Sequence, residues 1–280
     1  MKRGILPAIV FAMLGTLLWP PQARAQLVHY VDNVETCNGL LPCYTAIMDA
    51  VNAAMPSDSI EVFPGVYHEA AVFDRTKNNI ILRARIAALR PVITGGVLID
   101  HTPGIQVLDF FLEGGLQGYG ALDSVVAGNF INGGIHLQTT GNCTVSRNII
   151  IGGQIRFDTV SNCIVERNIV TGGGIDLMPL RGGAGFNVIR HNVVRGGGIS
   201  WGSGGGDTNS FNTVEANFVS GGSGIGIHSA NGYEDYNIFR RNTSVENTPC
   251  DIFDTVNNGP HNVNTWKNNR FFIKCGDATD

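Results

Sequence analysis

Three residues that could bind an anion or transfer a proton recur along the chain at equal intervals. His136, Arg156 and Asp176 each occupy the middle of a short apolar phrase, "IHL", "IRF" and "IDL". An arginine can hold a carboxylate through two parallel hydrogen bonds, and a histidine or an aspartate can act as a general base or acid. These three residues are therefore the candidate catalytic residues.

Two further polar residues, Gln138 and Asp158, follow His136 and Arg156 by two positions. Residues two apart in a β-strand lie on the same face, so both are candidate substrate ligands. Asp158 and Asp176 together could protonate a glycosidic oxygen or gather Ca²⁺ around an acidic sugar. The alternative is an ordinary exposed strand face on which Arg156 pairs with the two aspartates, an arrangement that contributes little stability.

The equal spacing of these residues belongs to a longer repeat. The phrase "NCTVSRNIIIGG", from residue 142, is followed by "NCIVERNIVTGG", from residue 162. Glycine pairs recur at nearly regular steps and begin at Gly95, Gly114, Gly133, Gly152, Gly172, Gly196 and Gly221. The last five pairs are preceded, four positions earlier, by Asn129, Asn148, Asn168, Asn192 and Asn217, and we expect Asn242 and Asn268 to extend this series. A short, nearly constant period with strand-sized apolar runs is typical of a stacked repeat.

This repeat predicts a right-handed parallel β-helix of roughly nine coils over residues 26–280, with three strands in each coil. Helical solenoids are excluded because a glycine pair in every repeat would break a helix, and because the apolar residues lack the spacing of a helical face. We expect the asparagines to form the first turn of each coil with positive φ and to stack as a hydrogen-bonded ladder. The glycine pairs would form the second turn.

Strand alternation assigns an outward column of side chains to the strands that follow the glycine pairs. Its expected members, about 4.8 Å apart, are Leu98, Gln117, His136, Arg156, Asp176, Ser200 and Gly226. Longer loops follow these strands in the later repeats, in "MPLRGGAG", "GSGGGDTN" and "HSANGYEDY". Side by side, these loops would border the column and supply the candidate ligands Arg181, Asp207, His228 and Asp235. The alternative is that surface loops vary in length at little cost.

The two ends of such a stack need covers, because their strand edges are unpaired. Residues 42–55, "PCYTAIMDAVNAAM", predict a capping helix whose residues Ile47, Ala50 and Val51 share one apolar face. At the other end, we expect the last coil to be closed by Trp266, Phe271, Phe272 and Cys275.

The six cysteines fall into three pairs. Cys37 lies close to Cys43 in the sequence, and Cys250 lies near Cys275 at the end of the chain, so we expect both pairs to form local disulfides. Cys143 and Cys163 occupy the same place in two successive repeats. For this pair, a stack of buried thiols is the favoured interpretation, and a disulfide is the alternative.

The segment 1–25 reads as a secretory signal peptide. Lys2 and Arg3 precede an apolar run, and "ARA" at positions 23–25 fits a cleavage site. Without Lys2, Arg3 and Arg24, the 19 basic residues of the chain become 16, against 23 acidic ones. This balance argues against nucleic acid as a partner. No later apolar run is long enough to span a membrane, so we expect a secreted or periplasmic protein.

One stretch of the sequence resembles a known family. "AIMDAVNAAMPSDSIEVFPGVYHE", followed by "NNIILRAR", is similar to the opening of secreted right-handed β-helix proteins of the pectin-lyase-like superfamily, and "FPGVYHE" carries most of the similarity. The resemblance implies the fold and a substrate groove over the strands that follow the glycine pairs. Members include polysaccharide lyases, glycoside hydrolases, uronan epimerases, esterases and proteins without known activity. The paired-aspartate motifs of polygalacturonases and the R-x-P-x-x-R motif of pectate lyases are absent, so the resemblance implies no particular mechanism.

Two functions from different classes remain. The first is an exported β-helix protein that binds an extended glycan or a partner along one strand face, with no assured catalysis, and the missing catalytic motifs favour it. The second is a polysaccharide lyase or glycoside hydrolase that acts on an acidic polysaccharide. The sequence assures no cofactor, and Ca²⁺ is the one ion that the candidate residues suggest.

Overall fold

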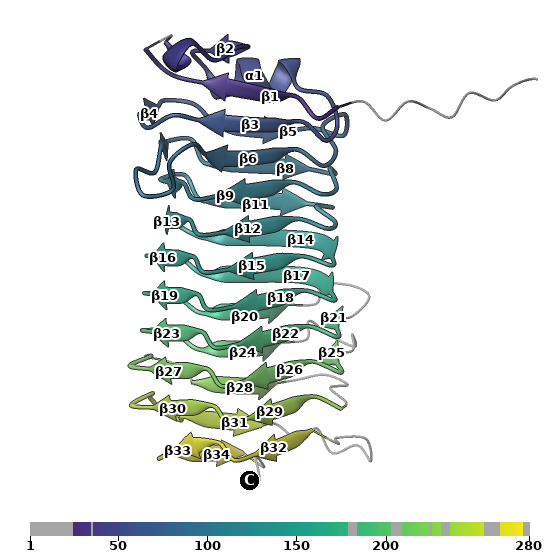
Figure 1. The fold of residues 1–280 in the computed structure, drawn as a ribbon. Helices are drawn as coiled ribbons and strands as arrows, with labels where there is room; N and C mark the ends of the chain where they lie inside the picture. The colour runs from purple at the N-terminus through teal and green to yellow at the C-terminus, as the bar shows by residue number, and fades with distance from the viewer. Residues whose placement is uncertain are drawn as a thin grey trace, which may run out of the picture.

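The computed structural model describes residues 25–34, 36–178, 184–202, 209–223, 226–230, 236–254 and 264–276. The chain forms a β-solenoid in which the coils stack and their strands pair in parallel (Figure 1). Two of its three sheets have twelve strands and the other has ten. The predicted parallel β-helix is confirmed, and the ten strands of the smaller sheet are close to the roughly nine coils expected.

We name the three sheets A, B and C in the order in which a coil visits them. Sheet A contains β1 (Val28–Val31), β2 (Cys43–Tyr44), β3 (Ser59–Val62), β6 (Ile81–Ala84), β9 (Gln106–Leu108), β12 (Val125–Ala127), β15 (Thr144–Ser146), β18 (Ile164–Glu166), β22 (Val188–Arg190), β26 (Thr213–Glu215), β29 (Ile238–Arg240) and β32 (Thr265–Lys267). Sheet B contains β4 (Val66–Tyr67), β7 (Val92–Ile93), β10 (Phe111–Leu112), β13 (Phe130–Asn132), β16 (Ile149–Ile151), β19 (Ile169–Thr171), β23 (Val193–Arg195), β27 (Phe218–Ser220), β30 (Thr243–Val245) and β33 (Arg270–Phe271).

Sheet C carries the strands that follow the glycine pairs. It contains β5 (Ala71–Phe73), β8 (Val97–Asp100), β11 (Leu116–Tyr119), β14 (Ile135–Gly141), β17 (Ile155–Ser161), β20 (Ile175–Met178), β24 (Ile199–Gly202), β28 (Ile227–Ala230), β31 (Ile252–Asp254) and β34 (Lys274–Gly276). Two short strands, β21 (Ala184–Gly185) and β25 (Asn209–Ser210), pair beside β17.

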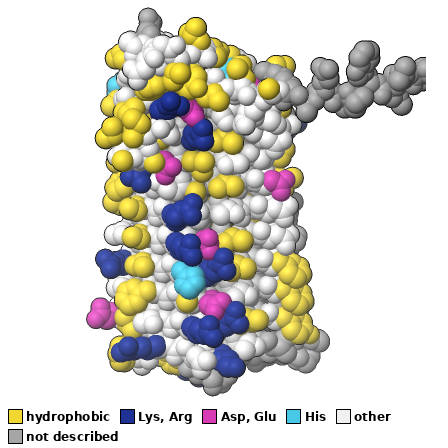
Figure 2. Space-filling view, viewed as in Figure 1, with side chains coloured by type: hydrophobic (Ala, Val, Ile, Leu, Met, Phe, Trp, Pro, Cys, Tyr) yellow, Lys and Arg dark blue, Asp and Glu magenta, His cyan; other side chains and the backbone are white. Residues whose placement is uncertain are grey.

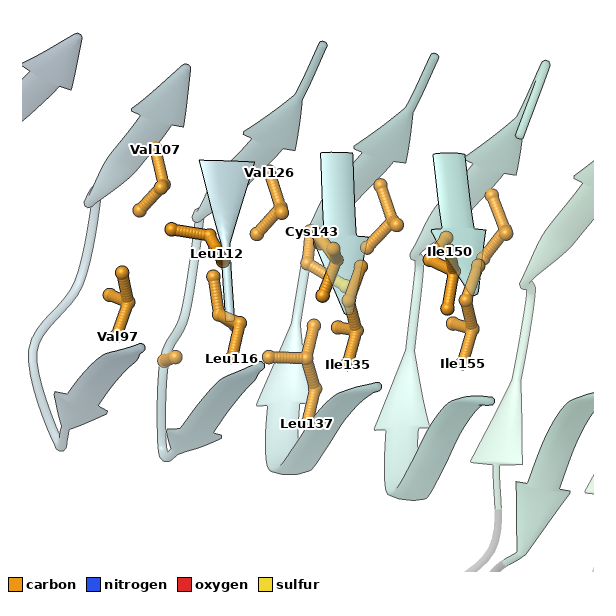
Figure 3. Close-up of a cluster of buried hydrophobic side chains, with 14 of the residues drawn as sticks. Val97, Val107, Leu112, Leu116, Val126, Ile135, Leu137, Cys143, Ile150 and Ile155 are labelled. Carbon is orange, nitrogen blue, oxygen red and sulfur yellow. The ribbon is translucent and has the colours of Figure 1, made fainter. Parts of the chain in front are cut away.

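Apolar rows that run along the solenoid form its core. Figure 3 shows side chains from all three sheets meeting inside the coils, among them Val107 of sheet A, Leu112 of sheet B and Leu116 of sheet C. The rows repeat by coil: Val107, Val126 and Val145 are in register and fully buried. Because buried apolar residues of one coil stack on buried apolar residues of the next, the core is continuous along the axis.

The turn between sheets A and B is held by a buried ladder of asparagine side chains. Its members are Asn129, Asn148, Asn168, Asn192, Asn217, Asn242 and Asn269. In one rung, Asn168 Oδ1 accepts hydrogen bonds from the backbone nitrogen and Nδ2 of Asn148, at 2.9 and 3.0 Å. Asn168 Nδ2 in turn donates to Val145 O at 2.9 Å. The predicted asparagine stack is confirmed.

The predicted backbone conformation of these asparagines was wrong. The residue with positive φ is the one before the asparagine, as at Arg147 (54°) and Arg167 (56°). The asparagine is needed for its buried amide, which supplies both donors and an acceptor. Likewise, the last rung is Asn269 and not Asn268, which is itself the residue with positive φ (55°).

The glycine pairs form the second turn, as predicted. One glycine of each pair has positive φ, for example Gly152 at 69° and Gly172 at 78°. The second glycine is needed for close approach between coils: a Cβ at Gly153 would lie only 1.4 Å from the carbonyl oxygen of Gly133. This turn therefore tolerates no side chain at that place.

The third turn, between sheets C and A, changes along the solenoid. The structure contains a disulfide between Cys143 and Cys163, whose Cα atoms are 4.5 Å apart, so the favoured stack of free thiols was wrong. The direct stacking of equivalent positions already brings the two side chains within bonding reach. Further along, a second asparagine ladder, which the sequence interpretation missed, occupies the same position, at Asn187, Asn212, Asn237 and Asn264.

Both ends differ in detail from the prediction. The capping helix α1 spans only Ile47–Ala53, because Cys43–Tyr44 forms β2 and extends sheet A. The Glu69 carboxylate caps this helix by accepting hydrogen bonds from the backbone nitrogens of its first two residues, at 2.8 and 2.9 Å. At the other end, Trp266 is buried against Phe239, but Phe272 is 73% exposed and does not close the coil. The predicted disulfides Cys37–Cys43 and Cys250–Cys275 are confirmed.

Candidate functional site

The predicted outward column belongs to sheet C, whose strands β8, β11, β14, β17, β20, β24 and β28 are labelled in Figure 1. The strand register places Gln117 beside His136, His136 beside Arg156, Arg156 beside Asp176, and Asp176 beside Ser200. The apolar residues that flank the first four in their strands are buried. The register therefore confirms the predicted column over these coils and brings the three candidate catalytic residues side by side.

The next member of the column is His228 and not Gly226. Strand β28 pairs Ile227 with Ile199, and therefore His228 with Ser200. Gly226 is instead buried, and a Cβ there would lie 2.2 Å from Ser244 Oγ. The sequence interpretation began this strand two positions too early, a shift that alternation cannot detect because it leaves the same residues facing outward. His228, predicted in a bordering loop, belongs to the column itself.

Asp158 links the first two candidate residues. Its side chain is only 3% exposed, and it accepts hydrogen bonds from His136 Nε2 at 2.6 Å and from Arg156 Nε at 3.0 Å. The His136 and Arg156 side chains remain 34% and 36% exposed. When the Asp158 carboxylate is ionised it can only accept hydrogen bonds, so in that state Nε2 of His136 is the donor. Asp158 is therefore a positioning residue for both exposed groups.

Asp176 has a different environment. Ser200 Oγ donates a hydrogen bond to its Oδ1 at 2.5 Å. Burial raises the pKa of the Asp176 carboxyl, while the hydrogen bond from Ser200 and the charge of Arg156 oppose that rise. The carboxyl consequently keeps a proton to a higher pH than an exposed aspartate does, as a general acid requires.

A groove of about 320 Å³ opens at the start of these strands. It is lined by Gly114, Gly115, Leu116, Gln117, Gly134, Ile135, His136, Gln154 and Arg156. Its three glycines carry no side chains, so bare backbone lines the groove beside the polar side chains of Gln117, His136, Gln154 and Arg156. Sequence reasoning missed Gln154, which takes the place of a third glycine in "GGQIRF". That substitution in an otherwise glycine-rich turn was the available signal.

The remaining predicted ligands divide into two groups. Gln138 lies beside Asp158 in the register, and Tyr119 precedes it in the same row, with its ring in a T-shaped contact with that of His136. Arg181, Asp207 and Asp235 lie outside the described residues, so their proposed place beside the column stays a prediction. Within the described part of the chain, no group of three or more His, Cys, Asp or Glu residues is arranged to hold a metal ion.

His228 follows Ser200 in the column, among the longer coils. Its ring lies 5.1 Å from that of Phe253, the next residue in the register. Burial lowers the pKa of the His228 imidazole. This histidine therefore tends to be neutral and can accept or donate one hydrogen bond without charge.

Comparison with known proteins gives the fold and nothing closer. No known family profile matches the sequence, and no curated protein sequence matches it. Among solved structures, the chain is similar to the tailspike protein of E. coli bacteriophage HK620 in complex with a pentasaccharide, with a TM-score of 0.56 and 10% identity, over 80% of this chain and 52% of the tailspike. It is also similar to a family 28 exopolygalacturonase of Yersinia enterocolitica, with a TM-score of 0.53 and 11% identity, over 88% of this chain and 66% of that one. The chain has the pectin-lyase-like right-handed β-helix fold.

The matched part of this chain spans about half the length of the tailspike. The candidate groove lies over the strands that follow the glycine pairs, as the resemblance implied. Among the residues that the structure describes, no helix is long and apolar enough to cross a membrane. The expected signal peptide, residues 1–25, falls outside the described residues except for Ala25.

Proposed function

We propose that this protein is exported and binds an extended glycan along sheet C, over His136, Arg156 and Asp176. The observation that carries the proposal is the groove of about 320 Å³ in which Arg156 and His136 are held by the buried Asp158. Rigid strands fix these groups before any ligand arrives, so binding costs little side-chain ordering. The column continues to Ser200 and His228 at one-coil intervals, which suits a ligand that extends along the axis.

An acidic sugar suits the charges of the groove best. Arg156 uses Nε for Asp158 and makes no other hydrogen bond with a described residue, so its terminal N–H groups can receive a carboxylate. Gln117 and Gln154 add amide donors and acceptors for hydroxyl groups. The pentasaccharide in the tailspike complex supports the use of this fold for oligosaccharide binding. Three disulfides support an oxidising, extracytoplasmic location.

Asp176 favours a second candidate function, cleavage of an acidic polysaccharide. Its raised pKa suits a general acid, and His136, whose Nδ1 forms no hydrogen bond with a described residue, suits a general base. Arg156 lies between them in the register and would neutralise a uronate carboxylate. In this version the protein is a lyase or a hydrolase.

The proposal is tested by measuring binding of the purified protein to a panel of neutral and acidic polysaccharides, with and without EDTA. Arg156→Gln should weaken binding of an acidic polysaccharide about tenfold or more, because a charge-assisted hydrogen bond is lost. Arg75→Gln, which removes an exposed arginine elsewhere, is the matched control. Failure of every polysaccharide to bind would refute the proposal. Release of reducing ends or of unsaturated products, abolished by Asp176→Asn, would establish the enzyme instead of the binding protein.

A further inference from the structure

A second array of charged side chains lies at the corner between sheets A and B, away from the groove. The residue with positive φ that ends each sheet A strand is Arg147, Arg167 and His191 in three successive coils. Their stacking is direct: Arg147 N donates to Glu166 O, and Arg167 N donates to Arg190 O, at 3.1 and 3.2 Å. All three side chains are exposed. We call them, with Arg90, the corner cations.

Arg90 extends the array by one coil. In the coil before Arg147, the equivalent residue is Gly128, which has no side chain. Arg90, from a different part of the chain, donates from Nε to the Gly128 carbonyl oxygen at 3.2 Å. A guanidinium group is therefore present even where the repeat itself supplies none. Four consecutive coils, about 4.8 Å apart, thus each present a basic side chain.

The carboxylates that end the neighbouring strands, Glu166 and Glu215, are engaged by other arginines, and Glu215 also interacts with the charge of His191. Glu166 is held by Arg190 at 2.8 Å, and Glu215 is held by Arg240 and Arg241 at 2.8 and 3.2 Å. Neither Arg147 nor Arg167 forms an ion pair with a described residue. Like charges in adjacent strands destabilise a sheet, and the chain as a whole has a formal net charge of −4. Figure 2 shows a column of charged side chains down the middle of one face, mostly dark blue, with magenta and cyan groups between them.

Apolar side chains flank the corner cations on one side. Ile149 and Ile169, two positions after Arg147 and Arg167, are 36% and 41% exposed on the outer face of sheet B. An acidic sugar ring has the same two features, a charged substituent and a face lined by C–H groups. A polymer of such rings repeats them at regular intervals, as the coils do.

We infer that the corner cations form a second binding surface, for a linear polysaccharide that carries a carboxylate or sulfate on its sugar rings. The anionic groups bind Arg90, Arg147, Arg167 and, when it is protonated, His191, while sugar faces pack on Ile149 and Ile169. This surface lies on different sheets from the proposed groove, and it does not depend on the function proposed for that groove.

The test compares two double variants by their affinity for polygalacturonate and for dextran sulfate, with neutral dextran as the uncharged probe. Arg147→Gln/Arg167→Gln should weaken binding of at least one polyanion about tenfold or more, because two charge-assisted contacts are lost. Arg75→Gln/Arg270→Gln removes two exposed cations near the ends of the solenoid and should change affinity less than about twofold. The melting temperature of the first variant should not fall, since repulsion between stacked cations is relieved.

Salt dependence of the wild-type protein gives a readout that needs no variant. Binding through several cations releases counterions, so affinity should fall steeply between low and physiological salt. The inference is overturned if neither polyanion binds, if the first double variant binds like wild type, or if only anionic lipid vesicles bind. It is also overturned, with the groove proposal upheld, if Arg156→Gln abolishes polyanion binding while the corner variant does not.

Discussion

The two halves of the solenoid, before residue 178 and after residue 184, share one turn and differ at another. Both use the asparagine ladder between sheets A and B, which runs without a break from Asn129 to Asn269. At the turn between sheets C and A, the first half has the Cys143–Cys163 disulfide and the second half has the asparagine ladder that starts at Asn187. The longer repeats of the second half therefore have their own support.

Both solutions meet the same requirement, an acceptor for a buried backbone N–H. In the first half, Cys143 N donates to Cys163 Sγ at 3.2 Å. At the boundary, Cys163 N donates to Asn187 Oδ1 at 2.9 Å, and from there each asparagine serves the one before it. The side chain at this position must therefore place a hydrogen-bond acceptor within reach of the backbone N–H of the preceding coil, and either a sulfur atom or an amide oxygen can do so.

The surface of the same corner also changes between the halves. The residues with positive φ are Asp123, Asn142 and Asn162 in the first half, and Phe186, Phe211 and Tyr236 in the second. The three aromatic rings stack in parallel at 5.1 and 5.2 Å and are at least half exposed. Phenylalanine is unfavourable in this conformation, so the stacking must offset a backbone cost that the asparagines avoid.

The largest effect is expected where both halves depend on one ladder. Asn168→Ala removes two hydrogen bonds accepted from Asn148 and two donated by Nδ2, to Val145 O and to Asn192 Oδ1, all at buried sites. Unsatisfied buried groups cost roughly 1–3 kcal/mol each, so the free energy of unfolding should fall by about 4 kcal/mol. Urea unfolding followed by circular dichroism measures this. Asn132→Ala, an exposed asparagine of β13, should stay within about 0.5 kcal/mol of wild type, and equal effects at the two sites would contradict the ladder.

The second prediction concerns replacing the disulfide of the first half with the asparagine pair used in the second half. Cys143→Ala/Cys163→Ala opens the loop that the disulfide closes, and should lower the free energy of unfolding by about 3 kcal/mol. Cys143→Asn/Cys163→Asn should recover about 1 kcal/mol or more of that loss, because Asn187 Oδ1 already accepts from residue 163 and the second ladder would continue upward. Thermal unfolding of both variants measures the difference. If the asparagine variant is no more stable than the alanine variant, the two turns are not interchangeable.

A smaller effect is expected at the aromatic corner. Phe211→Asn removes ring contacts with Phe186 and Tyr236 but places a residue that tolerates the φ of 61°. Each aromatic pair contributes about 0.5–1.5 kcal/mol, and the relief of backbone strain offsets part of it, so the net loss should be about 1 kcal/mol. Leu89→Asn, at another exposed apolar side chain, is the control. A gain in stability would mean that the stack exists for binding and not for folding.

The parts of this fold that the sequence predicted are those carried by repetition. The period of the repeat predicted the three sheets, the asparagine stack and the column His136–Arg156–Asp176. Once the repeats are aligned correctly with one another, equivalent residues fall at equivalent places in every coil. The position of His228 was missed, since a shift of two positions preserves alternation. The second ladder was missed because Asn187 replaces a cysteine, which broke the visible repeat.

The contacts within the site were less predictable than the column itself. The sequence placed Asp158 on the outer face, as a ligand, but it is almost fully buried between His136 and Arg156. Side chains that are diagonal neighbours on adjacent strands can meet, yet which pairs form depends on rotamers that no pattern encodes. The groove likewise depends on Gln154, one departure from the repeat.

The smallest effect is expected in the pH dependence of stability. It is predicted by comparing two histidines of one column, one in each half of the solenoid. His136 donates to the Asp158 carboxylate, whereas His228 packs on Phe253 and burial lowers the pKa of its imidazole below the usual 6.5. Protons then bind the unfolded state more readily than the folded one. The stability contributed by neutral His228 is fully present above pH 6.5 and is lost as the pH falls through the folded pKa.

His228→Gln should therefore flatten the fall in stability between about pH 7 and pH 5, as measured by urea unfolding at each pH. The difference between wild type and variant isolates this group from the carboxylates that titrate lower. His136→Gln is the matched variant, because it changes the same residue type in the same column but breaks a bond to a buried carboxylate, so it should lower stability at about pH 7. A His228→Gln difference that stays constant with pH would mean that the two histidines do not differ as their surroundings indicate.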